Sequence, residues 1–261
     1  MGPPDETPPG GVRPAEGVEG LYPFLYAGRA GLDTALEEAR RSTVEKAGEI
    51  VRLRRQVAEE SAAELAACAE EMAARFTAGG RLFSFGNGGS STDAQEVATT
   101  FLHPPRGRAL PALSLTTDVA VVTALSNDVG FEVVFARQLA ALGRSGDIAV
   151  GLSTSGGSAN VVRAFEEAAR RGMLTVGLAG GGGGRLAELG LLDYLFVVPS
   201  SSVHRIQEAQ TTLYHVLWEL TRHALATHAP PEAGQPRGTG HAPGTRDVPG
   251  PEPVPRAHGP G

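Results

Sequence analysis

The amino-acid sequence predicts an α/β protein in which a doubly wound parallel sheet is flanked by helices, with further helices on its N-terminal side. Short apolar runs alternate with runs of helical composition from Arg81 onward. Such alternation implies crossover connections, which give a parallel sheet covered by helices on both faces. Residues 33–77, before the first strand, are rich in Ala, Glu, Arg and Leu, which favour helices. Apolar residues make up 41 % of the 261 residues, so a substantial core can form.

The two ends of the chain differ in composition from its middle. Residues 1–20 and 229–261 are rich in Pro and Gly and poor in large apolar residues. Segments of this composition bury too little surface to offset the loss of chain entropy, so we expect both to be disordered. One folded domain over residues 21–228 remains.

The folded domain is expected to open with two helices, over residues 33–55 and 58–77, the second ended by Gly79 and Gly80. The first strand follows as "RLFSF" and ends at Gly86. The next helix is "STDAQEVATTFL", with Asp93 in its first turn, where a negative charge suits the helix dipole.

The later elements continue the alternation. The expected strands are "ALPALSL", "DIAVGLST", "LTVGLAG" and "YLFVVPS". The expected helices are "DVAVVTALSN", "VVFARQLAALG", "SANVVRAFEEAARRG", "GRLAELG" and a last helix from about residue 203 to residue 227. Ligands of such sheets bind beyond the carboxyl ends of the strands, and the Gly- and Ser-rich stretches of this sequence lie there.

Charge and cysteine content argue against several classes of function. The formal net charge is −6, whereas nucleic acid and anionic membranes favour proteins with basic patches. Cys68 is the single cysteine, so neither an intramolecular disulfide nor a cysteine metal cluster can form. The sequence opens with no signal peptide, and no run reaches the ~20 apolar residues that span a bilayer. We therefore expect a cytoplasmic protein with no nucleic-acid or membrane partner.

The stretch "GLSTSGGSANVV", from Gly151 to Val162, carries a cluster of hydroxyls between a buried strand and a helix. Several backbone N–H groups point at one spot there, and the helix N-terminus adds partial positive charge. With hydroxyls as further donors, a phosphate can be held without a cationic side chain. The alternative is an ordinary N-cap beside a loose serine loop, because Ser and Thr are common caps. The candidate phosphate ligands are Ser153, Thr154, Ser155 and Ser158.

A second polar loop, "GNGGSS" from Gly86 to Ser91, follows the first strand. It lacks the Gly-Lys-Ser/Thr of a P-loop, and Ser91 stands where a dinucleotide fingerprint has its third glycine. We therefore expect no nucleotide cofactor. Two polar loops on neighbouring strands suit a small polyhydroxylated phosphate better. A third stretch, "GGGGG" from Gly180 to Gly184, is expected to be a flexible connection.

Four motifs, in order, resemble the sugar isomerase (SIS) domain family: "GNGGSSTDA", "SNDVGFEVVFARQL", "GDIAVGLSTSGGSANVV" and "RIQEAQTTLYHVLWEL". More narrowly, they resemble its phosphoheptose isomerase branch, which acts on sedoheptulose 7-phosphate. The likeness covers residues from about 32 to 226. It implies an SIS-type, flavodoxin-like fold, a phosphorylated sugar as ligand, aldose–ketose isomerisation in heptose metabolism, and a homotetramer with sites at subunit contacts.

The resemblance also implies roles for individual residues. Gln207 would contact both sugar and metal, and His215 would be a metal ligand and acid–base group. The sugar would further contact Asn87, Gly88, Gly89, Asn127 and Asp128, and the phosphate would contact Ser153, Thr154, Ser155 and Ser158.

The sequence departs from the family pattern at the catalytic metal. The family has a histidine and, four residues later, a glutamate, both at a zinc ion, and the glutamate is also a catalytic base. Here these positions hold Glu96 and Thr100. Thr100 cannot take a proton from carbon at neutral pH, and a positioned base contributes about 100- to 10,000-fold in rate. Glu96, Gln207 and His215 remain as donors for zinc, which commonly recruits three or four strong ligands.

Two functions therefore stay open at this point. The chain is either an isomerase with Glu96 and His215 as its acid–base pair, or a sugar-phosphate sensor or scaffold that keeps the fold without the reaction. In the first case His204, which stands in place of a family aspartate, or His103 could assist Glu96. A third alternative, a nucleotide-dependent dehydrogenase, is supported by the stretch "GNGG" alone.

Overall fold

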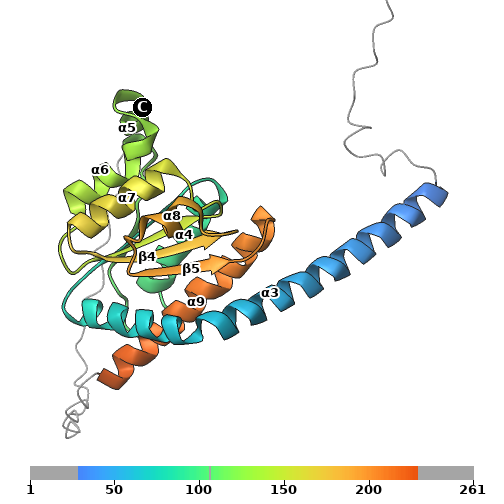
Figure 1. The fold of residues 1–261 in the computed structure, drawn as a ribbon, viewed down its shortest axis with the longest axis horizontal. Coiled ribbons are helices and arrows are strands. Elements are labelled where there is room, and N and C mark those ends of the chain that lie inside the picture. Colours follow the sequence, from blue (N-terminus) through green and yellow to red (C-terminus); the bar gives the residue numbers. More distant parts are fainter. Residues whose placement is uncertain (1–28, 106, 229–261) are drawn as a thin grey trace, which may run out of the picture. The chain divides into compact units, whose positions relative to one another are not determined.

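The fold is a five-stranded parallel sheet in the order β2-β1-β3-β4-β5, which is the flavodoxin-like doubly wound order (Figure 1). The computed structural model describes residues 29–105 and 107–228. The predicted fold class is confirmed, and the two tails expected to be disordered, 1–20 and 229–261, lie outside the described residues. The strands are β1 (Leu82–Gly86), β2 (Ala112–Ser114), β3 (Ile148–Ser153), β4 (Leu174–Gly180) and β5 (Tyr194–Val198).

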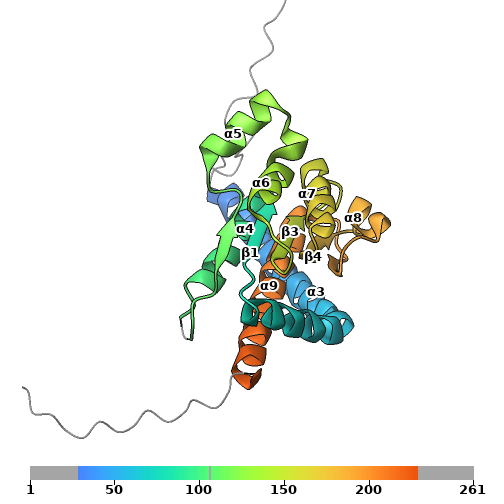
Figure 2. The ribbon, with the colours of Figure 1, turned by 90° about the vertical axis from the view of Figure 1, so that its left-hand side faces the viewer.

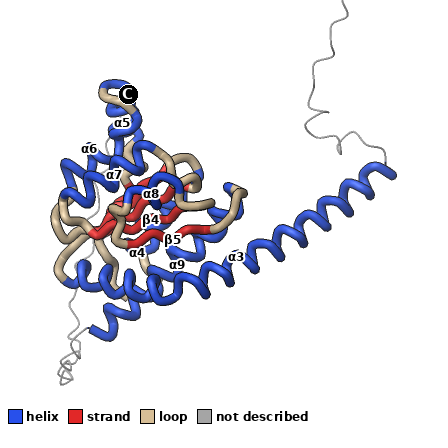
Figure 3. The backbone as a smooth tube through the Cα atoms, in the orientation of Figure 1, coloured by secondary structure: helices blue, strands red, loops and turns tan. Residues whose placement is uncertain are grey.

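Helices cover both faces of the sheet (Figures 1 and 3). One face packs against α3 (Arg29–Thr77), α4 (Gly89–Leu102) and α9 (Val203–His228). The other face packs against α6 (Val134–Leu142), α7 (Ala159–Arg170) and α8 (Gly184–Leu189). Helix α5 (Val119–Asp128) and the 3-10 helix η1 (Phe131–Val133) connect β2 to α6. Figure 2 shows α5 beyond the layer that α6 belongs to, and none of its residues is buried.

Each face of the sheet has its own core because side chains alternate along a strand. On the face toward α3, α4 and α9, strand β3 contributes Ile148 and Leu152, both fully buried. On the opposite face Gly151 leaves room for the rings of Phe85 and Phe165. A Cβ atom at Gly151 would lie 2.6 Å from atoms of either ring. The glycine is therefore required by packing between β3 and the aromatic side chains above it.

The N-terminal region forms one helix, α3, and not the two predicted over residues 33–55 and 58–77. Residues 49–77 contain neither Gly nor Pro, so nothing interrupts the helix between the two predicted segments. Val57 is its first buried residue, and every described side chain from Asp33 to Gln56 is exposed or only partly buried. This half of α3 runs clear of the sheet (Figure 1).

The strand register places the polar loops side by side. Strand β1 pairs with β3 so that Gly86 lies opposite Leu152, and Ser153 of β3 lies opposite Ala179 of β4. The loops that follow β1, β3 and β4 therefore begin at neighbouring points on one edge of the sheet, as the sequence predicted. Over the described part of the chain, no helix has the length and apolar content needed to cross a membrane.

Candidate functional site

Three serine hydroxyls converge where β3 gives way to α7. Ser153 ends the strand, and the chain then turns through Gly156 (φ 63°), whose N–H donates to the Ser153 carbonyl at 3.0 Å. The Oγ of Ser153 lies 3.1 Å from the Oγ of Ser158 and 3.5 Å from that of Ser155. Thr154, the fourth predicted ligand, lies on the same turn and is half-buried.

This loop is more than a helix cap. Ser158 occupies the N-cap position of α7, but its side chain makes no capping hydrogen bond and faces Ser153 instead. The first backbone bond of the helix runs from Val162 N–H to the Ser158 carbonyl at 3.0 Å, so the N–H groups before Val162 have no acceptor within the helix. Free amides and converging hydroxyls together suit an anion, and they favour the phosphate site over the N-cap alternative.

Glycines at the start of α4 bring α9 onto the first loop. Gly88 precedes the helix with φ 55° and ψ −123°, a conformation that favours glycine. A Cβ atom at Gly86 would lie 2.5 Å from the Ser90 carbonyl oxygen, and one at Gly89 would collide with the side-chain amide of Gln207. Gln207 of α9 therefore lies directly against the glycine loop. The shared role of these residues at a sugar site stays a prediction.

An amide pair joins the two loops. The side chain of Asn87 donates to the Oδ1 of Asn160 at 2.7 Å, and Asn160 donates back to the Oδ1 of Asn87 at 2.8 Å. Asn160 is 2 % exposed. Nothing in the sequence indicates this role for Asn160, because its partner Asn87 lies 73 residues earlier in the chain.

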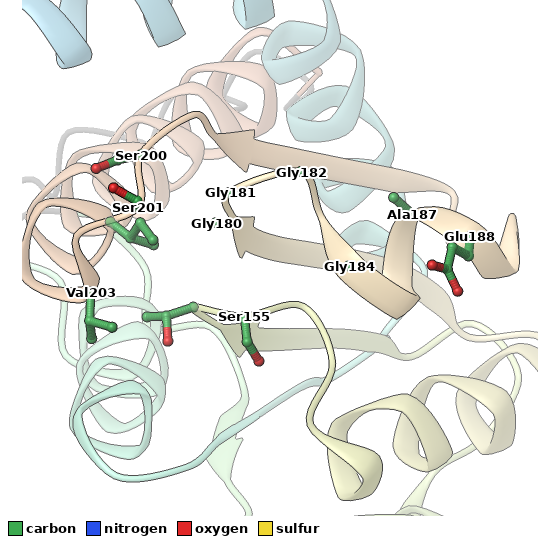
Figure 4. Close-up of a pocket in the computed structure, with 12 residues that line it drawn as sticks. Ser155, Gly180, Gly181, Gly182, Gly184, Ala187, Glu188, Ser200, Ser201 and Val203 are labelled. Carbon is green, nitrogen blue, oxygen red and sulfur yellow. The ribbon is translucent and has the colours of Figure 1, made fainter.

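The predicted flexible connection from Gly180 to Gly184 is instead packed in place. A Cβ atom at Gly180 would lie 2.5 Å from the Thr154 carbonyl oxygen, and one at Gly184 would collide with the carbonyl of Ser155. These glycines thus allow the β4 loop to pack against the serine loop. They also line a cavity of about 680 Å³, whose rim carries Ser155, Ser200 and Ser201 (Figure 4).

A second cavity, of about 340 Å³, lies between the N-terminal turns of α4 and α9. The prediction that Asp93 lies in the first turn of α4 is wrong, because the helix already begins at Gly89. Burial raises the pKa of Asp93; an interaction with the Tyr214 hydroxyl opposes this change, and the charge of Glu96 adds to it. The Oδ2 atom of Asp93 is buried with no hydrogen-bond partner in the described structure. The cavity is lined by Gly89, Thr92, Asp93, His204, Gln207, Glu208 and Thr211.

The predicted acid–base pair lies outside both cavities. Glu96 is exposed on α4, and the Thr100 hydroxyl lies 3.5 Å from its Oε1 atom. His215 is half-buried, with its ring centroid 4.9 Å from that of Tyr214. Neither Glu96 nor His215 contributes to the walls of the two cavities.

The "SND" residues also lie apart from the loops. Asn127 and Asp128 are exposed at the end of α5, and the Asn127 amide donates to the Asp128 carboxylate at 2.8 Å. Neither residue lines the cavity beside the serine loop or the one between α4 and α9.

The residues left for zinc do not make a typical zinc site. Among residues 29–228, with 106 set aside, no three His, Cys, Asp or Glu side chains come close enough to share a metal ion. Gln207 is a weak donor, and Thr100 supplies no carboxylate where the family pattern has one. Since zinc takes three or four strong ligands, Glu96, Gln207 and His215 do not fit such a centre.

The fold and the loops together define a class of protein: a doubly wound α/β domain with hydroxyls and backbone amides gathered at the ends of β1 and β3. Residues 47–180 match the family model of the SIS domain. The phosphoheptose isomerase of Nitratidesulfovibrio vulgaris (strain Hildenborough) is 44 % identical over 195 residues, 72 % of this chain and 91 % of its own length. That of Desulfovibrio desulfuricans is 47 % identical over 176 residues, 67 % of this chain and 83 % of its own.

Solved structures of phosphoheptose isomerases also resemble this chain in fold and sequence. The phosphoheptose isomerase GmhA of Neisseria gonorrhoeae superimposes with a TM-score of 0.66 at 36 % identity, covering 71 % of this chain and 99 % of its own. The enzyme of Francisella tularensis gives a TM-score of 0.65 at 33 % identity, with 70 % and 97 % covered. The chain therefore belongs to the SIS domain family and, within it, to the phosphoheptose isomerase branch.

Proposed function

We propose that this protein binds a phosphorylated sugar at the Ser153–Ser158 loop and catalyses the aldose–ketose isomerisation of sedoheptulose 7-phosphate. The observation that carries the proposal is the convergence of three serine hydroxyls on the N-terminus of α7, with Ser153 and Ser158 only 3.1 Å apart. The relatives named phosphoheptose isomerase support the choice of reaction. The isomerase is therefore favoured over the sensor or scaffold, although Thr100 replaces the family base.

In this arrangement the phosphate lies at the serine loop and the sugar extends toward the glycine loop. Asn87, Gly88 and Gly89 border that path, and Gln207 reaches it from α9. Asn160 fixes Asn87, so the phosphate end and the sugar end of the site are held at a constant separation.

The surface of α3 and α9 supports association of the chain with itself. An apolar groove of about 280 Å³ between these helices is lined by residues such as Ala62, Leu65 and Val216. Leu36 and Val44 on the uncovered half of α3 are 59 % and 62 % exposed. A helix gains little stability without burial of an apolar face, so we propose that further copies cover this surface in a homotetramer.

A neighbouring copy would also explain the position of Asn127 and Asp128. Helix α5 buries none of its side chains, and Val119 at its start is 68 % exposed. In the tetramer these two residues would serve the sugar site of another subunit. The proposed location is the cytoplasm, because a phosphorylated sugar carries charge and does not cross a bilayer unaided.

An assay with sedoheptulose 7-phosphate tests the function directly. Purified protein is incubated with the sugar, with and without added zinc, and the aldose product and the Tm are measured. The proposal predicts product and a raised Tm, both lost in a Ser153→Ala, Ser158→Ala double variant. A raised Tm without product would support the non-catalytic alternative. No change in Tm at saturating sugar would contradict both.

A further inference from the structure

The cavity between α4 and α9 is lined by three titratable side chains, Asp93, His204 and Glu208. Glu208 forms an ion pair with Arg205 at 2.9 Å, so Asp93 and His204 remain without a role. Asp93 enters it from the second turn of α4, and His204 enters it from the first turn of α9. Gln207, on the same wall as His204, lies against Gly89 of the glycine loop. The cavity therefore opens beside the path proposed for the sugar, and its volume of about 340 Å³ lies within the usual range for small-ligand pockets.

We propose that Asp93 and His204 form the acid–base pair of the isomerisation, in place of Glu96 and His215. This inference rests on the proposed function. Its geometric basis is that Asp93 and His204 line one cavity beside the glycine loop, whereas the predicted pair lines neither cavity. Isomerisation needs one group that removes a proton from carbon and another that protonates the carbonyl oxygen, and this cavity supplies one of each.

The surroundings of Asp93 suit a base. The Tyr214 hydroxyl interacts with its carboxyl group and favours the charged form of Asp93. Its Oδ2 atom has no hydrogen-bond partner among the described residues. Burial, with a smaller contribution from Glu96, raises the pKa of Asp93, so this carboxylate accepts a proton more readily than an exposed aspartate does.

The proton transfers balance without a further reagent. The Asp93 carboxylate removes a proton from C1 of the ketose, and the C1–H electron pair forms the C1=C2 double bond. The π electrons of the C2 carbonyl move to its oxygen, which takes a proton from protonated His204. His204 then accepts the proton of the C1 hydroxyl while Asp93 returns its proton to C2. The aldehyde forms at C1, and both side chains regain their starting states.

The test uses the full chain and separates proton transfer from binding. Asp93→Asn and His204→Gln are compared with wild type for affinity, for turnover, and for exchange of the C1 hydrogen in D2O. Glu219→Gln and His223→Gln are matched controls, because both residues are exposed on α9 away from the cavity. We expect Asp93→Asn and His204→Gln to bind the sugar within about threefold of wild type, and turnover to fall by about 100- to 10,000-fold. Exchange should be lost in Asp93→Asn, and the controls should match wild type.

Two results would overturn the assignment. The first is full turnover by Asp93→Asn together with loss of turnover in a Glu96→Gln, His215→Ala double variant. This result would assign the proton transfers to Glu96 and His215, and the proposed isomerase activity would still stand. The second is wild-type protein that binds the sugar but shows neither exchange nor product, which removes the isomerase as well. His204 is exposed, so its variant tests the pair even where Asp93→Asn does not fold.

Discussion

The side-chain amides of Asn87 and Asn160 exchange two hydrogen bonds, of 2.7 and 2.8 Å, between the loop after β1 and the first turn of α7. Each loop alone could adjust its position, because both are built from glycines and short polar side chains. The amide pair links them through a residue that is itself 2 % exposed. The two loops are therefore joined by hydrogen bonds between uncharged groups. The phosphate is expected to be bound in the same way, by uncharged hydroxyls and backbone amides.

Loss of this pair should destabilise the fold. In Asn160→Ala the half-buried Asn87 loses two hydrogen bonds, and each such bond contributes about 0.5–1.5 kcal/mol, so the loss is about 1–3 kcal/mol in total. We expect the free energy of unfolding, measured with urea, to fall by that amount. Asn127→Ala, at an exposed amide on α5, should stay within about 0.5 kcal/mol of wild type. Equal effects of the two substitutions would contradict the proposed link between the loops.

The serine hydroxyls should contribute separately to affinity. A hydrogen bond to a charged group contributes about 1.5–3 kcal/mol, which corresponds to roughly 10- to 100-fold in Kd. Ser153→Ala and Ser158→Ala are each expected to weaken binding of sedoheptulose 7-phosphate by that factor in calorimetry. Ser145→Ala, at an exposed serine before β3, should bind as wild type does. Unchanged Kd values in both loop variants would show that the phosphate does not bind at this loop.

A comparison of two glycines tests the contact between the β3 and β4 loops. Gly156 and Gly146 have positive φ values of 63° and 90°, so alanine is strained at either position by about 1–3 kcal/mol. A Cβ atom at Gly156 would also collide with the Gly183 carbonyl, whereas one at Gly146 meets nothing within 4 Å. Gly156→Ala should therefore lower the Tm clearly more than Gly146→Ala. Equal losses would mean that the two loops are not in close contact.

Stability should depend on the ionisation of Asp93. Burial raises the pKa of Asp93 above its ordinary 3.8, so the folded protein binds this proton more tightly than the unfolded chain does. The stability gained from this tighter proton binding is fully present below the pKa of Asp93 in the unfolded chain. It is lost as the pH rises through the pKa of Asp93 in the folded protein. Asp93→Asn removes the dependence, so wild type should lose stability relative to the variant as the pH rises above 3.8.

Urea unfolding at a series of pH values measures this difference, with Asp33→Asn on the exposed part of α3 as the control. A gap between wild type and Asp93→Asn that stays constant, or that favours wild type increasingly at higher pH, would contradict a buried Asp93.

The groove between α3 and α9 gives a prediction about assembly. Ala62→Glu places a charge on the groove, whereas Ala63→Glu places it on the neighbouring exposed position outside the groove. We expect light scattering to show a smaller assembly for Ala62→Glu and the wild-type mass for Ala63→Glu. The same mass for both variants would mean that another surface joins the copies.

The fold and the phosphate loop could be predicted from sequence because their signals are local. Apolar runs that end in Gly- and Ser-rich turns indicate both the strands and the edge at which ligands bind, and the register of Gly86 with Leu152 bears this out. Helix α3 was predicted as two helices although no residue between them breaks a helix. The surroundings of Asp93 and the partner of Asn160 depend on how α9 and α7 pack, which no local pattern specifies.

A crystal structure with bound sedoheptulose 7-phosphate tests the central claim most directly. We predict the phosphate at the N-terminus of α7, within hydrogen-bonding distance of the hydroxyls of Ser153 and Ser158. A phosphate bound in the cavity between α4 and α9, or a turn from Ser153 to Ser158 left without ligand at saturating sugar, would contradict it.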